Sequence, residues 1–326
     1  MRPPVYCATV DHGLRPESAA EAGQVARWAA TLGIPHATLA WLGPKPTTRL
    51  QERARDARYG LLAEHALAIG ADTLLTAHHA DDQAETILFR LARGSGIGGL
   101  AGMAREVVRH DIRLARPLLD LPKTDLLAIC DDAGQPYLLD PSNENPRFAR
   151  ARLRRLASVL EREGMGRDAW LRLGRRAARA EEALAAMFEA LWTALKPQEP
   201  AQVFLADIEP FRSAPVEMTT RLLARVIEAE GGHRPRLDRL ESLAQRVHDA
   251  HGRHAPLRAT LGDALVRLGR DGSLKVEREG PRRPRRALNP ANDRKIEGID
   301  LHNNGNMPAP APVLDVGSLG NRPHEA

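Results

Sequence analysis

Cysteine is scarce in this sequence, and Cys7 and Cys130 are the two present among 326 residues. Two cysteines can build neither a disulfide framework nor a four-sulfur metal site. Both lie between apolar residues, where a buried and unreactive thiol is the commoner outcome. The cysteine content therefore excludes small disulfide-stabilised domains and zinc sites with four sulfur ligands.

Aromatic residues are also few, at 4% of the chain, which argues against an aromatic stacking platform as the main route to binding RNA. No apolar run approaches the roughly 20 residues that a membrane span requires. The N-terminus lacks the apolar segment of a signal peptide. We therefore expect a cytoplasmic protein with no membrane partner. Hydrophobic residues still reach 43%, enough to build buried cores from Leu, Ala and Val.

Positive charge is unevenly distributed along the chain, although the formal net charge is only +5. Between Arg147 and Arg179 the sequence holds eleven arginines and three acids. A field of that sign attracts polyanions. A solvated helix face is the alternative interpretation, and the arginine run alone does not decide between them.

Strand and helix patterns alternate through the first half of the chain. Such alternation predicts an α/β fold with a doubly wound, Rossmann-like parallel sheet, which binds its ligands beyond the carboxyl ends of the strands. A capping box, Ser18 with Glu21, is predicted to open the first helix. The predicted strands are 4–10, 36–41, 73–77, 113–118 and 137–140, and the predicted helices are 18–32, 48–70, 81–92 and 122–134.

Beyond about residue 150 the pattern becomes helical, and a small β hairpin is predicted between Arg258 and Glu277. After Gly280 the periodicity is lost, which is typical of a disordered tail or linker. We therefore expect three parts. These are an α/β domain at 1–160, a helical and small α+β region at 161–280, and a tail at 281–326.

The most informative segment runs from Thr76 to Thr86, where a predicted strand gives way to a helix. His78, Asp81, Asp82 and Glu85 lie three and four residues apart, so they can share one helical face. Carboxylates at a helix start gain from the helix dipole but repel one another, so a magnesium ion, an ammonium group or an arginine is expected among them. Hard oxygen ligands favour magnesium over zinc. The plainer interpretation is capping by Asp81, with ordinary acids in the first turn.

A glycine-rich segment follows, with five glycines between Gly94 and Gly102. We expect a loop whose backbone amides, together with Arg90 and Arg93, could hold phosphate or RNA. Arg55 and Arg58 recur at helical spacing further upstream, where a solvated charged face is the default.

Together these strings resemble the tRNA(Ile)-lysidine synthetase family of N-type PP-loop ATPases. The most specific are HHxDDQxET at 78–86 and RGSGxxGLxGM at 93–103, and the resemblance is strong over 5–160 and weak over 160–280. The other matching stretches, in the family's order, are 10–15, 51–59, 116–119, 140–143 and 150–155.

The resemblance implies a two-step reaction on the tRNA(Ile) that carries the CAU anticodon. ATP adenylates the C2 oxygen of the wobble cytidine, and the side-chain amine of free L-lysine then displaces AMP to give lysidine. The codon read changes from AUG to AUA. ATP and Mg²⁺ would be the cofactors, and a homodimer is compatible with the resemblance.

The resemblance also implies roles for the residues that match its motifs. Asp81, Asp82 and Glu85 would be catalytic, with Asp82 and Glu85 binding lysine and Asp81 holding Mg²⁺. The ATP-binding residues would be Asp11, His12, Arg15 and His78. The tRNA-binding residues would be Arg55, Arg58, Arg93, Gly94, Ser95, Arg150, Arg152, Arg154 and Arg155.

One departure from the family's pattern bears on these roles. The family's SGGxDS phosphate loop does not occur in this sequence, which predicts an N-terminally truncated PP-loop domain. We favour a start codon assigned too late. The alternative is a non-catalytic, truncated tRNA-binding remnant without the ATP phosphate loop. A related PP-loop sulfur transferase is disfavoured because Cys7 and Cys130 share no CxxC motif.

Overall fold

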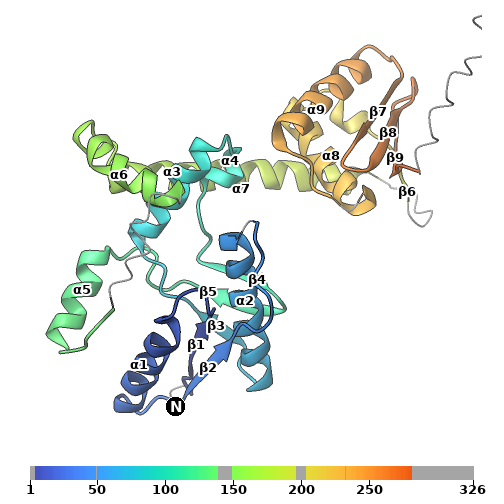
Figure 1. Cartoon of the computed structure of the whole chain (residues 1–326). Helices are drawn as coiled ribbons and strands as arrows, with labels where there is room; N and C mark the ends of the chain where they lie inside the picture. The colour runs from blue at the N-terminus through green and yellow to red at the C-terminus, as the bar shows by residue number, and fades with distance from the viewer. Residues whose placement is uncertain (1–3, 49, 139–148, 196–202, 232, 281–326) are drawn as a thin grey trace, which may run out of the picture. The chain divides into compact units, whose positions relative to one another are not determined.

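The computed structural model describes residues 4–48, 50–138, 149–195, 203–231 and 233–280. The described residues up to Glu279 group as one unit, whose elements are drawn in Figure 1. The predicted tail at 281–326 lies outside the described residues. Within the described ranges, no helix combines the length and apolarity needed to cross a membrane.

The first two strands form a parallel pair, as predicted. β1 (Cys7–Asp11) pairs with β2 (His36–Ala40), with Cys7 opposite His36. α1 (Ser18–Thr31) connects them and packs against both. This is a βαβ unit, which places the residues after Asp11 at the carboxyl end of a parallel strand.

A second sheet repeats the parallel pairing. β3 (Thr73–Leu75) pairs in parallel with β5 (Ile112–Ala115), and β5 also pairs antiparallel with β4 (Glu106–Arg109). α2 (Leu50–Ala68) precedes β3, and α3 (Ala80–Ala92) follows it. These parallel pairs confirm the predicted α/β class, although the described strands form two separate sheets in this part of the chain.

Several local predictions were wrong. β4 was not foreseen, and it turns into β5 through His110 and Asp111, which both have positive φ, as a two-residue hairpin requires. The glycine-rich segment is more than a loop, since it contains the short helix α4 (Ile97–Leu100). Tyr137 and Leu138 are not in a strand, and the rest of that predicted strand lies outside the described residues.

The predicted capping box at the start of α1 was also wrong. The N-cap is Glu17, whose side chain makes no capping hydrogen bond. The hydroxyl of Ser18 instead donates to Asp11 Oδ1 at 2.6 Å and to the carbonyl of Arg15 at 2.9 Å. Ser18 therefore ties the start of the helix to the end of β1.

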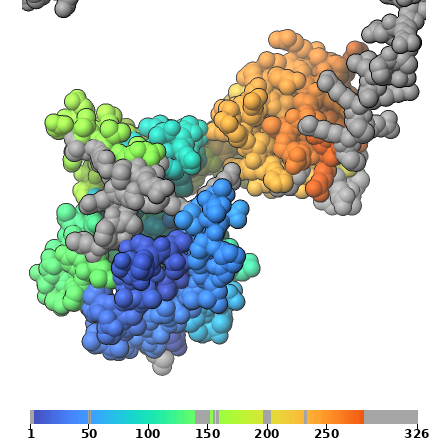
Figure 2. Space-filling model, viewed as in Figure 1, coloured from blue at the N-terminus to red at the C-terminus, as the bar shows by residue number. Residues whose placement is uncertain are grey.

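Three helices follow: α5 (Lys123–Asp132), α6 (Ala149–Arg162) and α7 (Arg167–Ala194). α7 packs against α3 and α4 (Figure 1). The contact is close at Gly174, where an added Cβ would lie 2.5 Å from Ile87 Cδ1. Green atoms of the α6–α7 region lie at the molecular surface in Figure 2.

The largest buried core of the described chain lies towards the C-terminus. A four-stranded antiparallel sheet runs in the order β6–β9–β8–β7, where a hairpin alone was predicted. Its apolar face packs on α8, and residues such as Phe211, Met218 and Leu222 are fully buried there. The elements are β6 (Val203–Asp207), η2 (Glu209–Phe211), α8 (Val216–Gly231), α9 (Leu237–Gly252), β7 (Leu257–Leu261), β8 (Ala264–Leu268) and β9 (Ser273–Arg278).

Candidate active site

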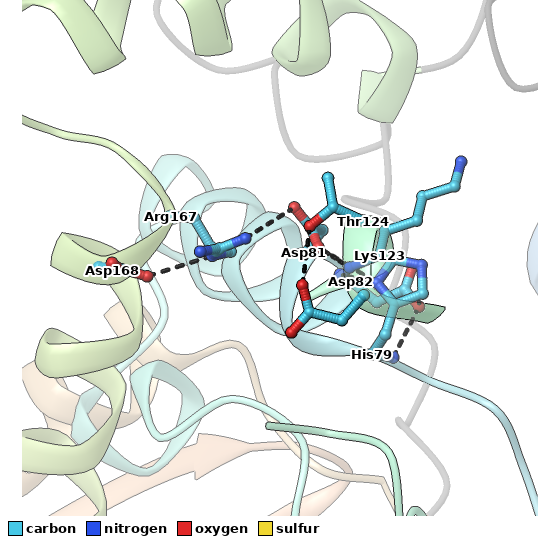
Figure 3. Close-up of polar contacts among 8 residues, drawn as sticks. His79, Asp81, Asp82, Lys123, Thr124, Arg167 and Asp168 are labelled. Carbon is cyan, nitrogen blue, oxygen red and sulfur yellow. Dashed lines mark hydrogen bonds and ion pairs between the residues drawn. The ribbon is translucent and has the colours of Figure 1, made fainter. Parts of the chain in front are cut away.

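The junction between β3 and α3 is organised by a capping box that involves His79. Its ring atom Nδ1 accepts from the backbone amide of Asp82 at 3.3 Å, and Asp82 Oδ2 accepts from the amide of His79 at 3.1 Å (Figure 3). Two amide groups that a helix start leaves unsatisfied thereby gain partners. His79 and not Asp81 is therefore the helix cap, and Asp82 completes the box.

Asp81 lies beside that box, with its Oδ2 3.6 Å from Nδ1 of His79, and also contacts two other helices. Its Oδ2 accepts from the backbone amide of Lys123 at 2.8 Å, and its Oδ1 lies 3.9 Å from Nη1 of Arg167 (Figure 3). α5 has Pro122 at its N-cap, a residue with no side-chain acceptor, so Asp81 supplies the missing acceptor. Asp81 thus links the starts of α3, α5 and α7.

The remaining predicted residues of this segment lie beside it. His78 Nδ1 is 2.9 Å from the hydroxyl of Thr76, and Glu85 is half-buried one turn further along α3. The side chains of Asp81 and Asp82 are 38% and 30% exposed, so water and ligands can reach both carboxylates. The structure therefore gathers the four predicted polar side chains at the carboxyl end of β3.

Side chains of α3 hold the glycine-rich segment in place. Gln83 donates to the carbonyl of Met103 at 3.0 Å and accepts from its amide at 2.7 Å. Arg90 donates to the carbonyls of Gly99 and Gly102, at 2.8 and 2.6 Å. Gly102 has φ +77°, and an added Cβ there would lie 2.7 Å from the Gln83 amide. Arg90, expected to help hold phosphate, directs its guanidinium into the protein backbone.

A second polar turn follows β1. Asp11 Oδ1 accepts from the hydroxyl of Ser18 and from the amide of Gly13 at 2.9 Å, and these two bonds lower the pKa of Asp11. His12 Nδ1 accepts from the amide of Leu14 at 3.1 Å. Arg15 pairs with Glu21 at 2.7 Å. Hydrogen bonds and an ion pair within the segment thus order three of the four residues predicted to bind ATP.

The carboxylates at the start of α3 are also candidates for a metal site. Among the residues that the structure describes, no group of three or more His, Cys, Asp or Glu side chains is arranged to hold a metal ion. A magnesium ion bound with a nucleotide needs only one or two protein carboxylates, because the phosphates and water supply the rest. The partly exposed Asp81 and Asp82 fit that smaller requirement, and the magnesium role of Asp81 stays a prediction.

Comparison with known proteins decides the family. A profile of the PP-loop domain matches residues 2–160. The tRNA(Ile)-lysidine synthase of Methylobacterium nodulans is 50% identical over 287 residues, which cover 86% of this chain and 84% of that protein. This chain belongs to the tRNA(Ile)-lysidine synthase family. A synthase of the same name from Methylobacterium sp. strain 4-46 is 49% identical over 86% of this chain and 83% of that protein. The one from Rhodopseudomonas palustris is 44% identical over 87% of this chain and 84% of that protein.

A solved structure matches more weakly. The U34-tRNA thiolase NcsA from Methanococcus maripaludis has a TM-score of 0.44 and 16% identity, over 53% of this chain and 62% of that one. A likeness at this level adds nothing to the family assignment.

The residues predicted to contact tRNA in this lysidine synthase family member lie on several elements. On α2, Arg55 donates to the hydroxyl of Tyr59 at 3.3 Å, and Arg58 is exposed. Arg93 is exposed at the end of α3, with its guanidinium 4.8 Å from the ring centre of Phe89. Gly94 and Ser95 follow it directly. These positions stay candidates.

The remaining tRNA candidates lie on α6. Arg152 is exposed there. The side chains of Arg150, Arg154 and Arg155 lie outside what the structure describes.

Three residues that organise the site were missed from the sequence. Gln83 stood inside the matching string, but nothing marked it as a backbone partner of Met103. The amide of Lys123 and the guanidinium of Arg167 approach Asp81 from distant segments. Only the tertiary structure brings those segments together, and no local sequence signal could have predicted either contact.

Proposed function

We propose that this protein joins lysine to the wobble cytidine of the tRNA(Ile) with the CAU anticodon, using ATP, and so forms lysidine. The observation that carries the proposal is the 50% identity to a tRNA(Ile)-lysidine synthase across 84% of that relative. The product would read AUA in place of AUG. Residues 1–160 would form the catalytic domain, and 161–280 would contact tRNA.

The reaction would run in two steps. The C2 oxygen of the cytidine attacks the α-phosphorus of ATP, and pyrophosphate leaves. The side-chain nitrogen of lysine then attacks C2, the bond between C2 and the adenylated oxygen breaks, and AMP leaves while the nitrogen loses a proton. The amine has to be held close to C2 and deprotonated, which are tasks for carboxylates.

The carboxylates of α3 would perform those tasks. Asp82 and Glu85 would bind the lysine ammonium and accept its proton. The capping bond of Asp82 uses Oδ2, and an ionised carboxylate has acceptor sites beyond one bond. Asp81, exposed at the same helix start, would face the magnesium-bound nucleotide. Asp11, His12, Arg15 and His78 would bind ATP at the carboxyl ends of β1 and β3.

The test is incubation of the protein, expressed from its own gene, with tRNA, ATP, Mg²⁺ and labelled lysine. Label should enter the CAU-anticodon tRNA(Ile) only when ATP is present. The Methylobacterium nodulans relative, assayed in parallel, controls for substrate quality. No incorporation by this protein while the relative is active would reject the proposal.

A further inference from the structure

Four arginines on α7 form one exposed stripe. Arg172, Arg175, Arg176 and Arg179 are all exposed and follow the spacing i, i+3, i+4, i+7. Residues at this spacing share one face of a helix. We call these four residues the α7 arginine face. It spans about 10 Å of helix axis, at 1.5 Å per residue.

The opposite side of α7 is fixed to the rest of the protein. Gly174 and Ala177 are buried, and Gly174 faces Ile87 of α3 and the backbone of Leu100 in α4. One turn later, Glu181 accepts two hydrogen bonds from Arg221 of α8, at 2.8 and 2.7 Å. The arginine face therefore sits on a helix that is held along its other side.

The charge of this face is not neutralised by the described residues. Leu171–Ala180 contains no acid, Asp168 and Glu182 flank it, and none of the four arginines has an ion-pair partner among the residues that the structure describes. Other arginines of the same region are paired, since Arg221 contacts Glu181 and Arg225 contacts Glu189. Four like charges within two turns repel one another, so the face favours a polyanion.

The chemistry of the face favours RNA over a lipid surface. Ala178, the exposed residue between the arginines, and Ala180, which follows them, are both alanines. A helix that lies on a membrane needs large apolar side chains beside its basic ones. Guanidinium groups matched to phosphates, without apolar anchors, are typical of contacts to a nucleic-acid backbone.

The helix that carries the face also reaches the candidate active site. Arg167, in the first turn of α7, lies 3.9 Å from Asp81 (Figure 3). Arg172 follows five residues later, about 7.5 Å further along the helix axis. α7 therefore carries the arginine face on one side and contacts the candidate active site with its first turn.

We propose that the α7 arginine face binds the sugar-phosphate backbone of the tRNA substrate. The inference rests on the proposed function for the identity of the RNA. It adds a contact surface, separate from the residues of α2, α3 and α6 predicted from the sequence, that contributes affinity without reading bases.

The test compares three variants of the full chain with the wild type. R172Q/R175Q/R176Q/R179Q removes the charges and keeps a good helix former. R172K/R175K/R176K/R179K keeps the four positive charges. R27Q/R53Q/R105Q/R113Q removes four exposed arginines outside the region proposed to contact tRNA, as a matched control. Binding of tRNA is measured by fluorescence anisotropy from 50 to 300 mM salt, and circular dichroism checks the fold.

The glutamine variant should bind tRNA about tenfold or more weakly at low salt. When the logarithm of affinity is plotted against the logarithm of salt concentration, the slope should be less negative by about 0.7–0.9 for each lost phosphate contact. The lysine variant should keep most of the affinity, and the control should resemble the wild type. Wild-type affinity and slope in the glutamine variant would overturn the inference. So would an equal loss in the control, because binding would then follow net charge alone.

Two further measurements separate the outcomes. Vesicles containing phosphatidylserine test the lipid alternative, and loss of vesicle binding with tRNA binding intact would overturn the inference. Lysine incorporation is measured on the same proteins. A wild-type protein that binds tRNA through this face but incorporates no lysine would reject the proposed function alone. An active wild type with an unaffected glutamine variant would reject the inference alone.

Discussion

The carboxylate of Asp81 accepts a hydrogen bond from the backbone amide of Lys123 over 2.8 Å, joining two helix starts that lie 42 residues apart in sequence. This contact gives Asp81 a structural task in addition to the catalytic one proposed for it. The two tasks depend on different properties of the side chain. The hydrogen bond needs an acceptor, whereas a magnesium-bound nucleotide needs negative charge.

Substitution of Asp81 should separate those tasks. Asp81→Ala removes the acceptor from the start of α5 and should lower the free energy of unfolding by about 1 kcal/mol, the usual cost of a lost cap. Asp81→Asn keeps an acceptor oxygen and should lose less stability. Both variants should lose most lysine incorporation. Urea denaturation and the incorporation assay measure the two effects, and an active Asp81→Asn variant would disprove the charge role.

Substitution of Asp82 and Glu85 tests the proposed lysine site. Asp82→Ala or Glu85→Ala should abolish lysidine formation while tRNA binding stays nearly unchanged, because neither carboxylate is proposed to contact RNA. Asp82→Asn is the matched control for the capping box, since its amide oxygen can still accept from His79. Turnover at the wild-type rate in Glu85→Ala would remove that residue from the site.

The crossing of α3 and α7 should be intolerant of a side chain at Gly174. A Cβ there meets Ile87, which is fully buried and has little room to move. Gly174→Val should therefore destabilise the protein by about 1–3 kcal/mol, the usual cost of overpacking. Ile87→Ala in the same chain should recover part of that loss. Thermal unfolding of the two single variants and the double variant measures the coupling, which would be zero if the two sites were independent.

Ser18 should control the titration of Asp11. Its hydroxyl and the amide of Gly13 lower the pKa of Asp11, so Ser18→Ala should raise that pKa towards its ordinary value. A depressed carboxylate pKa stabilises the fold above the unfolded-state pKa, and the stabilisation is lost as the pH falls through the folded-state pKa. The stability difference between wild type and Ser18→Ala should therefore shrink in acid. NMR titration of Asp11 and denaturation at several pH values check both statements.

Much of the local structure near the site was predictable, because periodic apolar residues mark α1 and α3 and a short apolar run marks β3. The acid cluster was also placed correctly at the end of β3. β4 was missed because its side chains are mostly exposed and carry no buried-strand pattern. The partners of Asp81 and Gln83 were missed because contacts between distant segments depend on packing, which leaves no periodic signal in the sequence.

Five glycines in nine residues would ordinarily give a segment with many backbone conformations to lose on binding. Here Arg90 and Gln83 have already fixed Gly99, Gly102 and Met103 through four hydrogen bonds. The conformational entropy of that stretch is therefore largely lost during folding. A ligand that docks on it meets a preorganised backbone and incurs a smaller ordering penalty than the composition alone suggests.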